Sequence, residues 1–147
     1  MSTPSPIVGI TRSVPGNPEI QGVCVKTLGD AKPTRDQLLS FVSGLDALVT
    51  MYTDKVDDAL LDAAGDQLKI VCNFAVGYDN IDVSACKSRG VIVCNTPDAV
   101  TEGTANLAWL LVMACSRRLI EADRYARSPA YQEHGQLGMS EFIGMDL

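Results

Sequence analysis

The sequence is poor in positive charge and contains a single histidine. Twelve Lys and Arg residues stand against eighteen Asp and Glu residues, which gives a net charge of −6. Nucleic acids and anionic membrane surfaces are bound through basic patches, so this balance argues against either as the main partner. The arginines that do cluster, at 117, 118, 124 and 127, have Glu121 and Asp123 among them, and we interpret them as a solvated helix face.

The sequence also lacks a long apolar run and any pattern of metal-binding cysteines. Its longest apolar stretch, Leu107 to Cys115, is far shorter than the ~20 residues that a membrane-spanning helix needs. The first six residues, Met-Ser-Thr-Pro-Ser-Pro, have neither the basic start nor the apolar stretch of a secretion signal. Five cysteines are widely spaced, without a Cys-x-x-Cys motif or a Cys/His cluster. We therefore expect a cytoplasmic protein with reduced cysteines, no metal and no membrane partner.

What is present is a globular chain of strands that alternate with helices. Apolar residues make up 46% and charged residues 20% of 147 residues, which is typical of about one folded domain. Short apolar runs cover 7–10, 22–28, 47–52, 68–75 and 91–94. Helical patterns capped by Thr34 and Asp82, and a further one over 56–64, lie between them. Such alternation predicts an α/β fold with a doubly wound, flavodoxin-like parallel sheet, covered on both faces.

The last third of the chain follows a different pattern. A single long helix is expected over 101–127, and its half from Ala105 to Cys115 is apolar on all sides, which predicts burial. Pro129 then interrupts the helical pattern. We predict a flavodoxin-like domain over 1–99, which is incomplete, a long interdomain helix over 100–128, and a connector over 129–147.

Ligands of open parallel sheets bind outside the carboxyl ends of the strands. This makes the segments 50–53, 73–80 and 95–106 candidates. In the second of them, Gly77 permits positive φ and the close approach of a ligand to the main chain. The amides of Val76 and Gly77 could form a small cradle for an anion. The alternative is an ordinary strand-to-helix turn in which Gly77 only relieves steric crowding.

The remaining candidates carry less information. The segment 95–106 places hydroxyl and amide groups ahead of a helix N-terminus, which attracts anions, although Asp98 or Thr101 could simply cap that helix. His134 lies in a polar segment and is interpreted as a solvated loop residue. The sequence contains no G-x-G-x-x-G, phosphate-binding loop or G-x-S-x-G motif, so no catalytic residue is assigned.

Three ordered motifs together carry a resemblance to a known family. They are Asn73-Phe-Ala-Val-Gly-Tyr-Asp-Asn-Ile-Asp82, Lys87-Ser-Arg-Gly-Val-Ile-Val-Cys-Asn-Thr-Pro97 and Thr104-Ala-Asn-Leu-Ala108. The chain closely resembles the D-isomer-specific 2-hydroxyacid dehydrogenases from its first strand to its last residue, most strongly over 49–118. Thr53-Asp-Lys-Val and Leu61-Asp-Ala-Ala-Gly65 resemble the glyoxylate/hydroxypyruvate reductase branch of that family.

The resemblance implies an oxidoreductase that reduces small 2-keto acids with NADH or NADPH, built from a flavodoxin-like substrate domain and a Rossmann coenzyme domain, and assembled as a homodimer. It implies that the amides of Val76 and Gly77 bind the substrate carboxylate. Met51 and Tyr52 would form part of the pocket wall, and Thr104 would contact the coenzyme. Asn106 departs from the acidic residue that is common at its place in the family.

The resemblance also implies that essential parts follow this stretch. In the family, the Gly-rich phosphate loop, the substrate-binding arginine, the Glu and the His acid/base all come later, and His134 does not match that histidine. We therefore predict a substrate-domain portion without a coenzyme domain or catalytic residues, inactive by itself. The alternative is a stand-alone flavodoxin-like module that binds a carboxylate or a protein partner without catalysis.

Overall fold

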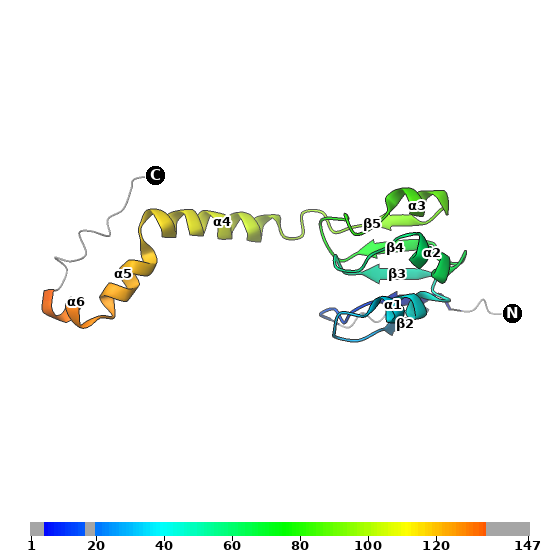
Figure 1. The fold of residues 1–147 in the computed structure, drawn as a ribbon, viewed down its shortest axis with the longest axis horizontal. Coiled ribbons are helices and arrows are strands. Elements are labelled where there is room, and N and C mark those ends of the chain that lie inside the picture. The colour runs from blue at the N-terminus through cyan, green and yellow to red at the C-terminus, as the bar shows by residue number, and fades with distance from the viewer. Residues whose placement is uncertain (1–4, 17–19, 135–147) are drawn as a thin grey trace. The chain divides into compact units, whose positions relative to one another are not determined.

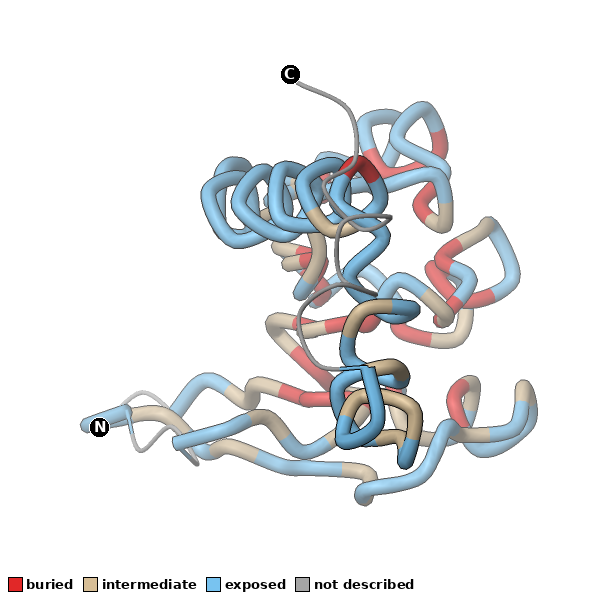
Figure 2. Tube along the Cα trace, turned by 90° about the vertical axis from the view of Figure 1, so that its left-hand side faces the viewer, coloured by how far each residue is buried: buried red, intermediate tan, exposed pale blue. Residues whose placement is uncertain are grey.

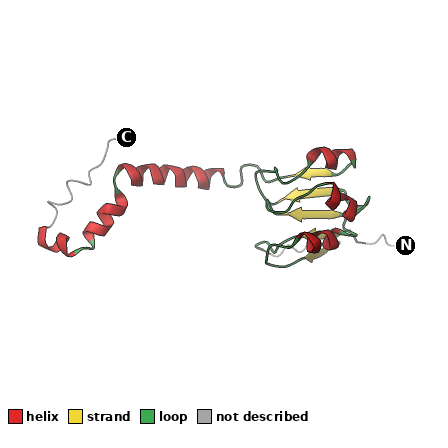
Figure 3. Ribbon diagram, in the orientation of Figure 1, coloured by secondary structure: helices red, strands yellow, loops and turns green. Residues whose placement is uncertain are grey.

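The computed structural model describes residues 5–16 and 20–134, and the chain divides into two units, 1–99 and 100–147 (Figure 1). The first unit alternates strands and helices (Figure 3). Its elements are β1 (Ile7–Ile10), β2 (Cys24–Thr27), α1 (Arg35–Val42), β3 (Ala47–Thr50), α2 (Asp58–Ala64), β4 (Ile70–Asn73), α3 (Val83–Ser88) and β5 (Ile92–Cys94). All strand pairs are parallel and the order is β2-β1-β3-β4-β5. The predicted α/β fold with a flavodoxin-like parallel sheet is confirmed.

Local signals in the sequence account for where the helices of this unit begin. Thr34 forms a capping box, because its hydroxyl accepts the amide of Gln37 at 3.3 Å while the Gln37 side chain accepts the Thr34 amide at 2.9 Å. Asp82 caps α3 by accepting the amide of Ala85 at 2.9 Å. Both predicted caps are confirmed.

The three helices of the first unit pack on one face of its sheet. Leu48 of β3 and Val71 of β4 are fully buried beneath them, in a core to which Leu38, Leu60 and Cys86 are contributed by the three helices. The connections that carry these helices, from β2 to β3 to β4 to β5, all cross the sheet in the same direction. Right-handed crossovers in one direction place their helices on the same side.

The opposite face of the sheet is only partly covered within the described part of the first unit. Val49 and Cys72 alternate with the buried strand residues and are half-buried, and Ile92 is 61% exposed. Figure 2 shows how buried, half-buried and exposed positions follow one another along the chain. The connection that reverses direction, from β1 to β2, contains no helix over its described residues. The expectation of helices on both faces is therefore met on one face only.

The second unit consists of α4 (Thr101–Ser116), α5 (Leu119–Ala126) and α6 (Pro129–His134) over its described residues. The prediction of a single helix over 101–127 is wrong. Arg118 adopts a left-handed conformation with φ of 50° and ψ of 42°, which breaks the helix between α4 and α5. Pro129 begins α6, where its missing N–H costs nothing, and His134 ends that helix instead of lying in a loop.

The apolar half of α4 is exposed rather than buried, contrary to the prediction. Leu107, Trp109 and Leu110 are 56%, 61% and 58% exposed. The apolar pattern of α4 is typical of a buried helix, but α5 and α6, which follow the break at Arg118, leave these side chains exposed. Among the described residues, no helix has the length and apolar character that a membrane span requires.

The ion pairs at the N-terminus of α2 lead to a prediction about acid stability. Asp57 caps α2 and pairs with Arg35 and Lys55. Partial burial raises the pKa of Asp57, but the hydrogen bonds from Arg35, from the Leu60 amide and from Lys55 outweigh it and hold the pKa below its ordinary 3.8. Because the pKa of Asp57 is lower in the folded chain, its charge stabilises the fold fully at pH values above the ordinary pKa of 3.8. This stabilisation is lost as the pH falls through the lowered pKa.

We therefore expect Asp57→Asn, which keeps a capping side chain, to lower the free energy of unfolding at pH 7 by about 0.5–1 kcal/mol. The difference from the native chain should shrink as the pH falls from 3.8 towards 2.5, because the native carboxyl then begins to take up a proton. Urea unfolding between pH 7 and pH 2.5 measures it, with Asp66→Asn as a control that removes one charge from an exposed position after α2. If the difference in the free energy of unfolding stayed constant down to pH 2.5, the lowered pKa of Asp57 would not be the cause of the stabilisation.

Candidate functional site

The candidate site lies where β3 and β4 end at the carboxyl edge of the sheet. The amide of Phe74, the first residue after β4, donates to the Thr50 carbonyl at the end of β3 with an N···O distance of 2.7 Å. The chain then turns over 74–80 before α3, and the loop that begins at Met51 lies beside this turn, since Asn80 donates to the Met51 carbonyl at 3.2 Å. The structure thus brings Met51 and Tyr52 to the same edge as Val76 and Gly77.

Two carbonyls of the turn are held by the segment that follows β5. The Ala75 carbonyl accepts the Thr96 amide at 3.0 Å, and the Val76 carbonyl accepts the side-chain amide of Asn95 at 2.8 Å. The peptide bonds are trans, so the N–H of each peptide unit points away from its carbonyl. The N–H groups of Val76 and Gly77 therefore both point away from the segment 95–96, to one side of the turn.

These two amides are available to a ligand. Among the described residues, neither N–H donates to a protein acceptor, and both residues are exposed. Two neighbouring N–H groups on one side of a turn suit a carboxylate, whose oxygens accept charge-assisted hydrogen bonds. The turn therefore has the geometry of the predicted anion cradle, which we define as the amides of Val76 and Gly77.

The conformation of Gly77 separates the two interpretations of this turn. Gly77 does not adopt the positive φ that glycine permits, and a Cβ built on it would meet no atom within 4 Å. Neither backbone strain nor crowding by the described residues thus requires glycine here. The alternative, in which Gly77 only relieves steric crowding, has no support from its surroundings, whereas close approach of a ligand remains consistent with them.

The loop after β3 is held by a buried carboxylate that sequence reasoning missed. Asp54 is 3% exposed, and its Oδ2 accepts both the hydroxyl of Thr11 and the amide of Met51, the latter at 2.9 Å. Buried charge is costly unless its hydrogen bonds are satisfied, so this arrangement favours one loop conformation. Met51 is itself 8% exposed and Tyr52 69% exposed, so Tyr52 supplies the side-chain surface of this loop.

A positive charge lies beside the same loop. Arg12 follows β1 and donates from Nη2 to the hydroxyl of Thr53 at 2.7 Å. Its Nε is buried and has no hydrogen-bond partner within the part of the chain that the structure describes. A guanidinium at this edge makes the local potential more favourable for an anion.

Thr104, the predicted coenzyme contact, lies in α4 of the second unit. Its residue is exposed, and its amide donates to the Val100 carbonyl at 2.9 Å. Val100 occupies the N-cap position of α4, so neither Asp98 nor Thr101 does. The coenzyme contact of Thr104 stays a prediction. No group of three or more His, Cys, Asp or Glu residues suited to a metal occurs among the described residues.

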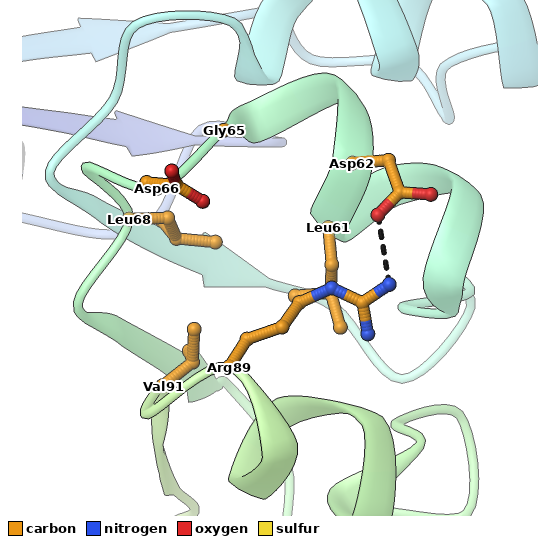
Figure 4. Close-up of a pocket in the computed structure, with 7 residues that line it drawn as sticks. All are labelled: Leu61, Asp62, Gly65, Asp66, Leu68, Arg89 and Val91. Carbon is orange, nitrogen blue, oxygen red and sulfur yellow. Dashed lines mark hydrogen bonds and ion pairs between the residues drawn. The ribbon is translucent and has the colours of Figure 1, made fainter.

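A cavity lies at the opposite, amino edge of the sheet, between α2 and the end of α3 (Figure 4). Its charged residues already neutralise one another in part, because Arg89 donates to Asp58 and Asp62 at 2.7 Å each. Asp66 adds a further negative charge to the lining. This cavity is therefore a poor site for a carboxylate, and the carboxyl edge remains the candidate.

Comparisons with known proteins assign the chain to a family. Residues 15–143 match the sequence profile described as D-isomer specific 2-hydroxyacid dehydrogenase, catalytic domain. A glyoxylate reductase from Thermococcus kodakarensis is 50% identical over 114 residues, which are 77% of this chain and 34% of the relative. The chain spans about a third of the length of that relative.

Solved structures show the same relationship. A 2-hydroxyacid dehydrogenase from Ketogulonicigenium vulgare superposes with a TM-score of 0.74 at 29% identity, over 90% of this chain and 42% of that one. An NADPH-dependent glyoxylate/hydroxypyruvate reductase from Sinorhizobium meliloti, solved with NADP and malonate, superposes with a TM-score of 0.61 at 28% identity, over 89% of this chain and 40% of that one. With the profile match over most of its length, the chain belongs to the D-isomer specific 2-hydroxyacid dehydrogenase family of oxidoreductases.

Proposed function

We propose that this chain is the substrate-binding portion of an NAD(P)H-dependent 2-hydroxyacid dehydrogenase that reduces small 2-keto acids such as glyoxylate or hydroxypyruvate. The observation that carries the proposal is the pair of exposed amides of Val76 and Gly77, which have no acceptor among the described residues and point to one side of the turn. They bind the substrate carboxylate, and Met51 and Tyr52 form part of the wall around it.

The chemistry of a 2-keto acid explains why such a cradle matters. Reduction adds a hydride to the carbonyl carbon and a proton to its oxygen, and the carboxylate is attached directly to that carbon. Binding the carboxylate therefore also positions the reacting carbon, which is one bond away. The reaction then starts from a bound, oriented substrate instead of from free molecules in solution. The nicotinamide coenzyme supplies the hydride when bound. The residues of this chain bind and orient the acid, and Thr104 is proposed to contact the coenzyme.

Names of relatives support this assignment over a binding module without catalysis. The relatives compared above are named reductases and dehydrogenases, and one of them was solved with NADP. The homodimer and the cytoplasmic location stay predictions.

Carboxylate binding can be tested on the 147-residue chain. We expect oxamate, an unreactive analogue of a 2-keto acid, to shift the backbone amide resonances of Val76 and Gly77 in two-dimensional NMR spectra. Lactamide, a neutral molecule of similar size, should leave them in place, since it lacks the charge that strengthens the hydrogen bonds. Oxamate shifts confined to residues around Arg89, or none at all, would contradict the proposed function.

A further inference from the structure

We propose that Asn95 is a positioning residue of the anion cradle: by holding the Val76 carbonyl, its side chain directs the Gly77 N–H toward the substrate carboxylate. The proposal rests on the function proposed above. Asn95 does not touch the ligand in this proposal, because its hydrogen bond lies on the far side of the peptide unit.

The peptide unit between Val76 and Gly77 is the one that requires support. It lies in a turn outside the sheet, so no strand ladder fixes its rotation. A rotation of this unit would carry its N–H away from that of Val76. The bond from Asn95 Nδ2 to the Val76 carbonyl, at 2.8 Å, opposes this rotation. The neighbouring bond from the Thr96 amide to Ala75, at 3.0 Å, holds the preceding unit in the same sense.

The next peptide unit is anchored from inside the sheet. Asn73, which is 1% exposed, donates to the Gly77 carbonyl at 2.7 Å and to Oδ1 of Asn80 at 3.0 Å. Its own Oδ1 accepts the hydroxyl of Thr50 at 3.0 Å. The buried amide group is thus satisfied on both sides, which favours a single rotamer. With this anchor rigid, the rotation of the unit between Val76 and Gly77 depends on Asn95 alone among the described side chains.

Asn80 extends the anchor to the loop after β3. Its side-chain amide donates to the Met51 carbonyl at 3.2 Å and to the Asp54 carbonyl at 2.9 Å. The turn and the loop therefore form one hydrogen-bonded frame at the carboxyl edge. Within this frame, Asn95 is half-buried and lies outside the strands, so its side chain can be removed without opening the core.

The test compares Asn95→Ala and Asn95→Asp with the native 147-residue chain. Alanine removes the donor, and aspartate keeps the shape of asparagine while presenting an acceptor to the Val76 carbonyl. Ser88→Ala is the matched control, because it also removes one side-chain bond to a backbone carbonyl, at 2.9 Å to Ala85, at the opposite edge of the sheet. Oxamate titrations followed by NMR give the affinity, and residual dipolar couplings give the orientation of the Gly77 N–H.

We expect both Asn95 variants to bind oxamate about tenfold more weakly or worse, since one charge-assisted hydrogen bond is misdirected. The Gly77 N–H coupling should change while the couplings of the sheet and the thermal midpoint stay within error of the native chain. Ser88→Ala should bind as the native chain does. Native affinity in Asn95→Ala, or losses that spread through the sheet, would overturn the proposal. If the native chain itself gives no shift at Val76 and Gly77, it is the proposed function that fails.

Discussion

Replacing Gly77 with valine should lower kcat/KM for glyoxylate by at least about tenfold while leaving the fold intact, in an enzyme that carries this chain. A Cβ at position 77 meets no atom of the described residues beyond its chain neighbours within 4 Å, and the backbone there is not left-handed, so the free protein has room at the first carbon of the new side chain. The added methyl groups instead occupy the space in which the carboxylate approaches the main chain. Loss of one charge-assisted hydrogen bond, about 1.5–3 kcal/mol, corresponds to tenfold or more.

The measurement uses a fusion of this chain, in register, to the remaining part of the Thermococcus kodakarensis glyoxylate reductase, which is 50% identical over the shared stretch. Steady-state kinetics should show the loss in kcat/KM for glyoxylate and little change in KM for the coenzyme. Gly77→Ala should give a smaller loss. Lys87→Val, which adds a branched side chain at an exposed position near the opposite edge, serves as control. Wild-type kcat/KM in a folded Gly77→Val enzyme would show that the turn binds no substrate.

The 147-residue chain by itself should give no turnover of NADH or NADPH with glyoxylate or hydroxypyruvate. Reduction requires a bound hydride donor and a group that delivers a proton to the carbonyl oxygen. The sequence contains no G-x-G-x-x-G motif, and its single histidine, His134, ends α6 with an exposed side chain beside Glu133. The amides of Val76 and Gly77 provide hydrogen-bond donors for the carboxylate, but a backbone amide is no acid for the carbonyl.

Absorbance at the nicotinamide band measures this, with the same fusion protein as the positive control. Turnover by the fusion and none by the chain would support the proposal that this chain binds the substrate while the remaining part of the fusion supplies the coenzyme site and the acid. Turnover by the purified chain that is abolished by Gly77→Val would place an acid/base within these 147 residues and contradict the prediction.

Local chemistry explains which parts of the fold could be predicted from the sequence. Thr34 and Asp82 cap helices through their own side chains within three residues, so their roles depend little on the rest of the molecule. The strands can be recognised as short apolar runs, and their alternation with helices favours a parallel sheet. The break at Arg118 could not be predicted in this way, because a left-handed residue within a helical pattern has no signal in composition.

The position of the candidate site could be predicted from the sequence, but the hydrogen bonds that hold its turn and loop could not. Val76 and Gly77 follow a buried strand, and carboxyl ends of parallel strands meet at one edge, which is enough to predict a ligand site there. Asn73 was visible as a polar residue at the end of an apolar strand, yet its partners Gly77 and Asn80 depend on the fold of the turn. Asp54 gave no signal, because a carboxylate in a polar loop is usually exposed.

The sequence by itself determined the strands, the helix caps, the α/β class and the edge at which we predict a ligand site, since these follow from short-range periodicity and from the polarity of parallel strands. Tertiary structure alone decided that α1, α2 and α3 share one face of the sheet, because that depends on strand order. It alone also decided that Asn95 meets the Val76 carbonyl across nineteen positions. Hydrogen bonds between segments so far apart in the chain arise only after β4 and β5 have paired, and these bonds direct the amides on which the proposed function depends.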